Sequence, residues 1–229
     1  MADRQRREIV TEPAILYNDD LLLAVDKPSG LAVAPDRWDK AADHLVWWVH
    51  ARVGTAWFNV HRLDKDTSGV VLFGNGPEAV AALTERFESR QVTKVYEALV
   101  RGRPARSRGA IASPLSADPR RPGKMIVDPS GRPARTQYDI RRIWSAGVSL
   151  LELWPLTGRT HQLRVHLASI GCPILADPFY GAGEADHDVI GRLALHARRL
   201  TLIHPTTGLP LTIESPLPQA FEAAMAKLG

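Results

Sequence analysis

The segment HRLDKDTSG, residues 61–69, holds the side chains best placed to do chemistry. Asp64 follows His61 and Arg62 and precedes a run of turn-forming residues. A turn alone can explain such carboxylates, because Asp, Thr and Ser side chains bond to nearby backbone groups. Apolar residues bound the segment on both sides, however, so we expect a rigid turn between two buried strands. Rigid loops are where catalytic groups are commonly placed.

A second candidate group lies near residue 160. The stretch TGRTHQLRVHLASIG predicts a helix from about 160 to 170 that ends at Gly171. Its apolar face should hold Leu163, Leu167 and Ile170, at i, i+4, i+7 spacing. His161 and Arg164 share a different face, at the helix end that suits an anion. A surface salt bridge is the alternative explanation for an isolated arginine.

The strand QVTKVYEALV, residues 91–100, supplies a third group. Its alternation places Lys94, Tyr96, Ala98 and Val100 on one side. Phosphate-binding glycine loops and a GxSxG nucleophile elbow are absent from the sequence. By elimination, the chemical candidates are Asp64 with Tyr96, Arg164 and Lys94. Such groups can carry out covalent or acid–base chemistry at a sugar or a heterocycle.

Metal binding is the main rival use for the histidines. The candidates would be His161, His166, His196, His204 and Asp177. His161 and His166 are five residues apart, about 500° around a helix, so they point in different directions. No HExxH or comparable ligand spacing occurs. We therefore expect no metal site and regard His196 and His204 as hydrogen-bonded strand residues.

The elements that must position these groups are mostly strands joined by short turns. The expected strands are AILYND, LLLAVDKP, VVLF, QVTKVYEALV, RTQYDIRRIW, VSLLELWPL, LALHARRLTLIHP and LPLTIESP. The expected helices are AADHLVWWVHARVG, NGPEAVAALTERFESR, the helix near 160–170 and PQAFEAAMAKLG. Val80, Leu83 and Phe87 should form one face of the second helix. The pattern indicates an α+β fold with a mixed, mainly antiparallel sheet.

Composition restricts the class of protein. The 229 residues suit a single large domain, residues 1–229, with a flexible tail over 1–12. Hydrophobic residues make up 45% and charged residues 24%, and no apolar run reaches the roughly 20 residues that span a bilayer. The charged N-terminus does not resemble a signal peptide. One cysteine, Cys172, excludes an internal disulfide. We expect a cytoplasmic location.

Positive charge is concentrated in residues 101–142. This segment has eleven Lys or Arg and three Asp, although the whole chain has a net charge of only +4. The interspersed Pro, Gly and Ser predict loops and turns. A solvated, poorly ordered surface is one interpretation. Contact with the phosphates of a nucleic acid is the other, and charge alone does not separate the two.

Five blocks together resemble the RluA-type pseudouridine synthases, which modify ribosomal and transfer RNA. The blocks are HRLDKDTSG, DKPSGLAV (26–33), KVYEALVRG (94–102), LTGRTHQLRVHLASIGCPILADPFYG (156–181) and LHARRLTLIHPTTG (195–208). They follow the family's order and span nearly the whole chain. The resemblance implies a two-lobed catalytic domain around a shared sheet, with RNA in the cleft. The chain resembles the short members, which lack an extra N-terminal RNA-binding domain.

The resemblance also implies roles for single residues. Asp64 matches the catalytic aspartate, and Tyr96 the tyrosine that stacks on the target base. Arg164 matches the basic partner of the aspartate, and Arg62 the arginine that fills the space of a flipped base. We further expect substrate contacts from polar residues of the same blocks, namely His61, Lys94, Arg159 and His161. No cofactor and no metal is implied.

One carboxylate is enough for this reaction. Isomerising uridine breaks the bond from ribose to the ring nitrogen and rejoins the uracil through carbon. Water does not take part, whereas a hydrolytic glycosidase generally needs two carboxylates. The aspartate must be ionised, which a neighbouring guanidinium favours. The stacked base must flip out to be reached, and an aromatic ring gives it a surface.

Two other functions use parts of the same pattern. A non-catalytic RNA-binding or ribosome-assembly protein needs the basic loops, but it does not need Asp64, Tyr96 and Arg164 together. A metal-dependent hydrolase would use the histidines and would be inhibited by a chelator. The sequence does not specify which RNA and which uridine are modified, or whether Asp64 attacks the base, attacks the ribose or removes a proton. Its pattern leaves oligomeric state open, and we expect a monomer.

Overall fold

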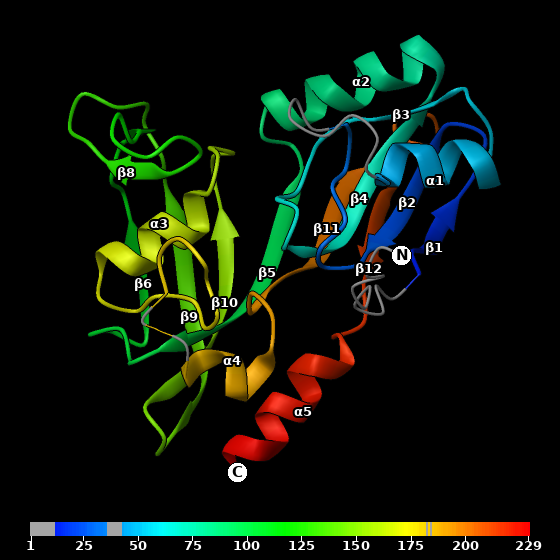
Figure 1. Ribbon diagram of the computed structural model, residues 1–229. Helices are drawn as coiled ribbons and strands as arrows, with labels where there is room; N and C mark the ends of the chain where they lie inside the picture. Colours follow the sequence, from blue (N-terminus) through cyan, green and yellow to red (C-terminus); the bar gives the residue numbers. More distant parts are fainter. Residues whose placement is uncertain (1–11, 36–42, 182, 184) are drawn as a thin grey trace, which may run out of the picture.

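The computed structural model describes residues 12–35, 43–181, 183 and 185–229, so nearly all of the tail expected over 1–12 lies outside the described residues. A ten-stranded sheet runs through this part of the chain (Figure 1). Its strands are β1 (Ala14–Asn18), β2 (Leu22–Lys27), β3 (Trp57–Asn59), β4 (Ser68–Asn75), β5 (Thr93–Arg101), β6 (Arg108–Ile111), β9 (Thr136–Trp144), β10 (Val148–Pro155), β11 (Leu195–Ile203) and β12 (Pro210–Glu214). Their order is β1-β2-β4-β11-β5-β10-β9-β6, with β12 beside β11 and β3 beside β4.

The sheet is mixed because β4 and β11 are parallel, while its other pairs are antiparallel. In Figure 1, β5 lies between two lobes, with β1–β4, β11 and β12 on one side and β6, β9 and β10 on the other. A separate two-stranded hairpin, β7 (Leu115–Ala117) and β8 (Met125–Val127), stands at the top of the second lobe. The α+β, two-lobed fold expected from the sequence is confirmed.

Successive side chains of β2 and β4 point to opposite faces of the sheet, which explains how two helices cover these two faces in the first lobe. Helix α1 (Leu45–Arg52) packs with Leu23, Val25 and Phe73, whereas α2 (Gly76–Glu88) packs with their neighbours Leu22 and Leu72. Successive strand residues point to opposite faces, so each helix meets every second side chain. This lobe is therefore a three-layer structure.

The second lobe has its own core, against which the remaining helices pack. These are α3 (Gln162–Ser169), α4 (Ala185–Ile190) and α5 (Gln219–Leu228). Leu163, Leu167 and Phe221 are buried there against residues of β5 and β10. Tyr96 of β5 packs against the core clusters of both lobes. The strand that carries Tyr96 thus forms the junction between them.

The structure corrects several details of the predicted elements. Ile170 was expected in the core but is 39% exposed, because α3 ends at Ser169. Helix α3 also begins at Gln162 rather than near 160, which leaves His161 in front of the helix. The 101–142 segment, expected as loops and turns, contains three short strands, β6, β7 and β8. Strands of only three or four residues are too short to show an alternating apolar pattern, and they form through pairing with their partners.

Candidate active site

The loop that carries Asp64 joins β3 to β4 and is fixed to the end of β2. The Thr67 N–H donates to the Asp64 carbonyl at 3.1 Å and closes the turn. The Gly30 N–H donates to the Lys65 carbonyl at 3.0 Å, and the Ser29 hydroxyl donates to the Asp66 carbonyl at 2.6 Å. The turn expected from the sequence is therefore stabilised by its own backbone hydrogen bond and by two hydrogen bonds from residues 29 and 30.

Lys27, the last residue of β2, connects this loop to the interior. Its side chain is completely buried, and its ammonium donates to the carbonyls of Pro28, Leu31 and Lys65 at 2.7–2.8 Å. Burial, with the nearby Arg192 charge, lowers the pKa of Lys27 to about 7, against the opposing pull of nearby aspartates. Three acceptors match the three N–H bonds of the ammonium form. Lys27 is thus a buried support for the Asp64 loop.

A buried polar network holds the other end of the loop, where β4 begins. The Ser68 hydroxyl lies 2.8 Å from His196 Nδ1 and accepts a hydrogen bond from Arg192 at 2.9 Å. On the far side of the ring, the Ser215 hydroxyl lies 3.2 Å from His196 Nε2 and donates to Asp26 at 2.8 Å. The network joins β2, β4 and β11 with the segment after β12. His196 is, as expected, a hydrogen-bonded strand residue.

Arg164 of α3 approaches Asp64 from the second lobe. Its Nη1 lies 3.4 Å from Asp64 Oδ2, while its Nε and Nη2 donate to the two oxygens of Asp177 at 2.7 Å each. The Arg164 and Asp177 side chains are 3% and 0% exposed, and Asp64 is 29% exposed. Burial alone would lower the pKa of Arg164, but Asp177 and then Asp64 raise it above its ordinary value. Asp64 therefore faces a permanently charged guanidinium.

Tyr96 and Lys94 project from the same side of β5, as the alternation predicted. Burial raises the pKa of the Tyr96 hydroxyl, and the charge of Asp64 raises it further. Within the described residues the Tyr96 hydroxyl has no hydrogen-bond partner. Burial lowers the pKa of Lys94, whose ammonium lies near Gly158 in the loop that leads to α3. The structure therefore brings Tyr96 close to Asp64 and leaves its hydroxyl free.

The basic pair before Asp64 divides into one buried and one exposed residue. The His61 ring stacks on Phe87 at 4.6 Å between centroids, and its Nε2 accepts the Leu72 N–H at 3.0 Å. Burial, with the charge of Lys94, lowers the pKa of His61 to about 3, so the ring is neutral. These contacts give His61 a role in anchoring the loop to β4 and α2. Arg62 is exposed to solvent.

His161 and Arg159 lie in the loop before α3. The His161 Nε2 is 3.8 Å from Asp64 Oδ2, and its Nδ1 is 3.0 Å from the Tyr180 hydroxyl. The Arg159 side chain donates to the Pro133 carbonyl at 3.1 Å. Asp64, Arg164 and His161 thus meet at one point, with Tyr96 near them, while Arg159 lies beside residue 133. In the part of the chain that the structure describes, no group of three or more His, Cys, Asp or Glu side chains could hold a metal ion.

Comparison with known proteins identifies the family of the chain. The sequence pattern of the RNA pseudouridylate synthase family matches residues 21–169, which is more than half of the chain. The chain belongs to this family. It is 38% identical over 203 residues to the dual-specificity RNA pseudouridine synthase RluA of Escherichia coli strain K12, covering 88% of this chain and 92% of RluA. The RluA of Yersinia pestis is 39% identical over 198 residues, covering 86% of this chain and 95% of the relative.

Solved structures agree with the assignment. The human RNA pseudouridylate synthase domain containing 4 superposes with a TM-score of 0.75 at 30% identity, over 93% of this chain and 92% of that one. The human RNA pseudouridylate synthase domain containing 1 gives a TM-score of 0.76 at 29% identity, over 93% and 87% of the two chains. The protein is an RNA pseudouridine synthase, an isomerase of the RluA type. Among its described residues, none of the helices has the length and apolar character needed to cross a membrane.

The basic segment of this pseudouridine synthase divides into two groups of side chains. One group forms ion pairs: Arg108 and Arg141 with Asp139, and Arg101 with Asp186. The other group has exposed side chains with no ion-pair partner among the described residues: Arg103, Arg106, Arg120, Arg121, Arg132 and Arg135. Arg120 and Arg121 lie in the turn of the β7–β8 hairpin, which internal hydrogen bonds between Asp118, Arg121 and Lys124 fix. Part of the positive charge is thus free to contact RNA on an ordered surface.

Three residues of the pseudouridine synthase site were not identified from the sequence. Lys27 and Tyr180 lie inside quoted blocks but received no role, and Asp177 was considered only as a metal ligand. Each forms a hydrogen bond with a residue at least 13 positions away in the sequence: Lys27 with residue 65, Asp177 with residue 164 and Tyr180 with residue 125. The one available signal was the position of Lys27 two residues after the apolar run LLLAV, in register with the buried residues Leu23 and Val25 of the expected strand.

Proposed function

We propose that this enzyme converts uridines of ribosomal or transfer RNA to pseudouridine with Asp64 as its catalytic group. The observation that carries the proposal is the contact of Asp64 Oδ2 with Arg164 Nη1 at 3.4 Å beside Tyr96 of β5. The Asp177 carboxylate already neutralises Arg164 through two shorter hydrogen bonds. Arg164 therefore contacts Asp64 without binding it tightly, so the Asp64 oxygens stay available for reaction.

The chemistry needs one such carboxylate. The bond between C1′ of the ribose and N1 of uracil breaks, the base turns, and C1′ bonds to C5. The proton on C5 leaves and N1 gains one, so atoms and charge balance without water or a cofactor. Asp64 acts as nucleophile or as base in this sequence. The ribose–uracil junction would lie against the 29% exposed Asp64 carboxylate.

The proposed substrate contacts follow from position and charge. Tyr96 offers a ring for the flipped base, because its hydroxyl is not tied to a neighbouring group and its ring lies where the two cores meet. Arg62, exposed and two residues before Asp64, enters the vacated stack. Lys94, Arg159 and His161 provide further polar contacts to the RNA. His61 stabilises the Asp64 loop by accepting the Leu72 N–H at its Nε2.

The RNA target, the oligomeric state and the cellular location of the enzyme are also proposals. RluA of Escherichia coli is named a dual-specificity enzyme, which supports more than one RNA target here. We also propose that the enzyme is a monomer, and ribosomal and transfer RNA as proposed targets support a cytoplasmic location. Mapping pseudouridines in ribosomal and transfer RNA from cells with and without the protein identifies the targets. Light scattering of the purified protein, with and without RNA, checks the monomer.

Asp64→Asn tests the catalytic role. The substitution keeps the size of the side chain and removes its charge, so isomerisation should fall below detection while RNA binding persists. Turnover is measured as tritium release from C5 of labelled uridine in RNA, and binding by gel-shift titration. Asp66→Asn is the matched control, since it alters the same turn and is expected to keep most of its turnover. Wild-type tritium release from Asp64→Asn would refute the proposal.

A further inference from the structure

A chain of polar contacts leads from the basic β7–β8 hairpin to the Asp64 carboxylate. The N–H of Met125, the first residue of β8, donates to the Tyr180 hydroxyl at 2.8 Å. That hydroxyl lies 3.0 Å from His161 Nδ1, and His161 Nε2 lies 3.8 Å from Asp64 Oδ2. The four residues come from separate parts of the sequence, so the chain of contacts exists only in the folded protein.

The donors fix the direction of these contacts. A backbone N–H can only donate, so Met125 occupies one lone pair of the Tyr180 oxygen, and the phenolic O–H, which needs an acceptor, has His161 Nδ1 at 3.0 Å. A neutral imidazole that accepts at Nδ1 carries its proton on Nε2, the nitrogen that faces Asp64. The opposite tautomer would turn a nitrogen lone pair toward a carboxylate, which is electrostatically unfavourable.

Burial favours the neutral form of the His161 ring. Burial lowers the pKa of the imidazole, and Arg164 acts in the same direction, while Asp64, Asp177 and Asp66 oppose them with a smaller effect. The ring is 12% exposed, packed by Phe179 and Tyr180 at 5.6 and 5.7 Å between centroids. A neutral ring with a defined tautomer therefore faces Asp64.

The backbone of His161 is strained in order to place this ring. Its φ of 52° lies in the left-handed region, which His161 shares with only two other non-glycine residues of the described chain, Arg90 and Ala176. Such a conformation costs about 1–3 kcal/mol and persists where surrounding contacts enforce it. Here the aromatic pair 179–180 and the Val165 N–H, which donates to the His161 carbonyl at 2.9 Å, hold it.

Both neighbours of Asp64 approach the same oxygen. Arg164 Nη1 and His161 Nε2 lie 3.4 and 3.8 Å from Oδ2. Among the described residues no donor contacts Oδ1 of Asp64. The two oxygens are therefore distinguished by their surroundings, one held and one open.

We propose that His161 is a positioning residue, held by Tyr180 in the Nε2–H tautomer, which fixes Oδ2 of Asp64 together with Arg164 and leaves Oδ1 as the reacting oxygen. The inference rests on the proposed catalytic role of Asp64. At 3.8 Å the N–H acts on the carboxylate through its dipole rather than through a hydrogen bond. Loss of this dipole lets the carboxylate rotate and lowers the fraction of productive encounters.

Two substitutions of His161 separate its two nitrogens. Gln places an amide N–H where Nε2 lies, and Asn reaches only the position of Nδ1. We expect His161→Gln to keep kcat within about fivefold of wild type and His161→Asn to lose about tenfold to hundredfold in kcat, with a smaller rise in KM from the lost polar contact to RNA. Asn tolerates positive φ well, so His161→Asn should unfold at the wild-type temperature or above it. Equal kcat values for the two variants would overturn the proposal.

Tyr180→Phe tests the tautomer without touching the imidazole. The ring stays beneath Arg164 and Lys124, so RNA affinity should stay within about twofold of wild type, while kcat falls. Removing a donor to the neutral ring raises the pKa of His161, and a protonated ring weakens Asp64 as a base or nucleophile. The acid limb of the kcat–pH profile should therefore move to higher pH, which a merely structural role of Tyr180 would not cause.

Tyr138→Phe is the matched control, because Tyr138 is a buried tyrosine of the same lobe whose hydroxyl lies beside Gly109. It should keep the wild-type pH profile. A wild-type kcat and pH profile in Tyr180→Phe would overturn the proposal. Asp64→Asn is measured in parallel: if it stays active, the proposed function fails, whereas an inactive Asp64→Asn with wild-type His161→Asn and Tyr180→Phe overturns only the positioning role.

Discussion

The Asp64 carboxylate meets a guanidinium that already has a carboxylate partner. Arg164 donates two hydrogen bonds of 2.7 Å to Asp177 and makes one longer contact of 3.4 Å with Asp64. A tight bidentate pair with Arg164 would occupy both Asp64 oxygens and lower their reactivity. Asp177 thus holds the Arg164 guanidinium beside Asp64 without letting it block both Asp64 oxygens.

Tyr96→Phe separates stacking from proton transfer at the same site. The ring remains at the junction of the two cores, so RNA affinity should not change, but the free hydroxyl is lost. We expect turnover to fall by about 10²- to 10⁴-fold, the usual contribution of a positioned acid or base. Tritium release and gel-shift titration measure the two quantities. Full turnover in Tyr96→Phe would limit Tyr96 to stacking.

Lys27→Met tests the support beneath the Asp64 loop. The change removes the donor to the carbonyls of residues 28 and 31 and one of two donors to the carbonyl of residue 65, so we expect the free energy of unfolding to fall by about 2–4 kcal/mol. Turnover should fall as well, because Lys65 adjoins Asp64. Urea denaturation and tritium release check both. Lys65→Met, which changes an exposed lysine of the same loop, should be close to wild type in both measurements.

At the scale of elements, hydrophobic periodicity predicted most of the architecture. The alternation of residues 91–100 placed Lys94 and Tyr96 on one side of β5, and the i, i+3, i+4 pattern found α1 and α2. Periodicity did not predict the short elements whose formation depends on contacts with other segments of the chain. The strands of the β7–β8 hairpin, three residues each, exist through their mutual pairing, and α4 has only six residues.

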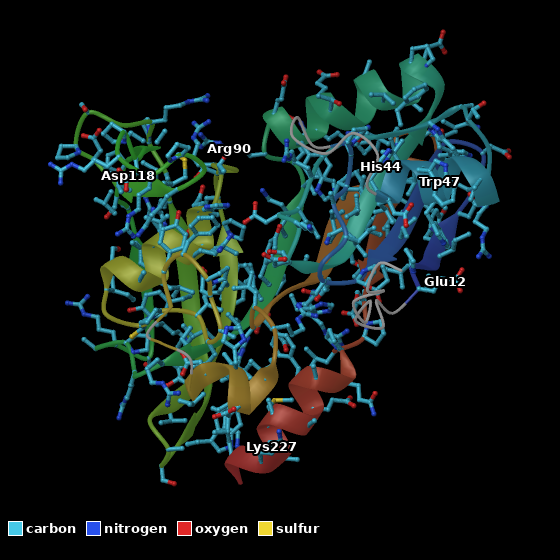
Figure 2. All side chains as sticks on the ribbon, viewed as in Figure 1. Glu12, His44, Trp47, Arg90, Asp118 and Lys227 are labelled. Atoms are coloured by element: carbon cyan, nitrogen blue, oxygen red, sulfur yellow. The ribbon has the colours of Figure 1, made fainter. Side chains whose placement is uncertain are left out.

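The β7–β8 hairpin carries a prediction of its own. Arg120, Arg121 and Lys124 lie in its turn, and Asp118, where the turn begins, is labelled near the top of Figure 2, with Lys227 at the bottom of the view. Replacing the three basic residues with Ala should weaken RNA binding and reduce the slope of log affinity against log salt by about 2–3. Lys227→Ala is the control, and its slope should equal that of the wild type. An unchanged slope in the triple variant would mean that these side chains are only solvated.

At the scale of the whole molecule, the chain's last segment takes part in holding the catalytic loop. The Ser215 hydroxyl bridges His196 and Asp26, and His196 in turn bonds Ser68 at the end of the loop. The ten-stranded sheet joins both lobes of the described residues, and a single domain over residues 1–229 stays a prediction. Periodicity could not reveal this network, because it joins residues 26, 68, 196 and 215 through the final packing.

Ser215→Ala should therefore destabilise the entire protein rather than its end. Removing the hydroxyl leaves buried groups of His196 and Asp26 unpaired, at a cost of about 1–3 kcal/mol. Urea denaturation followed by fluorescence and by tritium release should show one shifted transition with both probes. Ser145→Ala, at an exposed turn, should leave the midpoint unchanged. A fluorescence midpoint that does not move would contradict the coupling.

The place of β11 in the sheet has a consequence for the synthesis of the protein. β11 lies between β4 and β5, yet among the strands of the sheet only β12 follows it in the chain. While the ribosome is still adding residues before 195, β4 and β5 each present an unpaired edge, and such edges invite aggregation. We expect nascent chains to depend on chaperones until β11 emerges, and the Asp64 loop to become ordered only then, when His196 reaches Ser68.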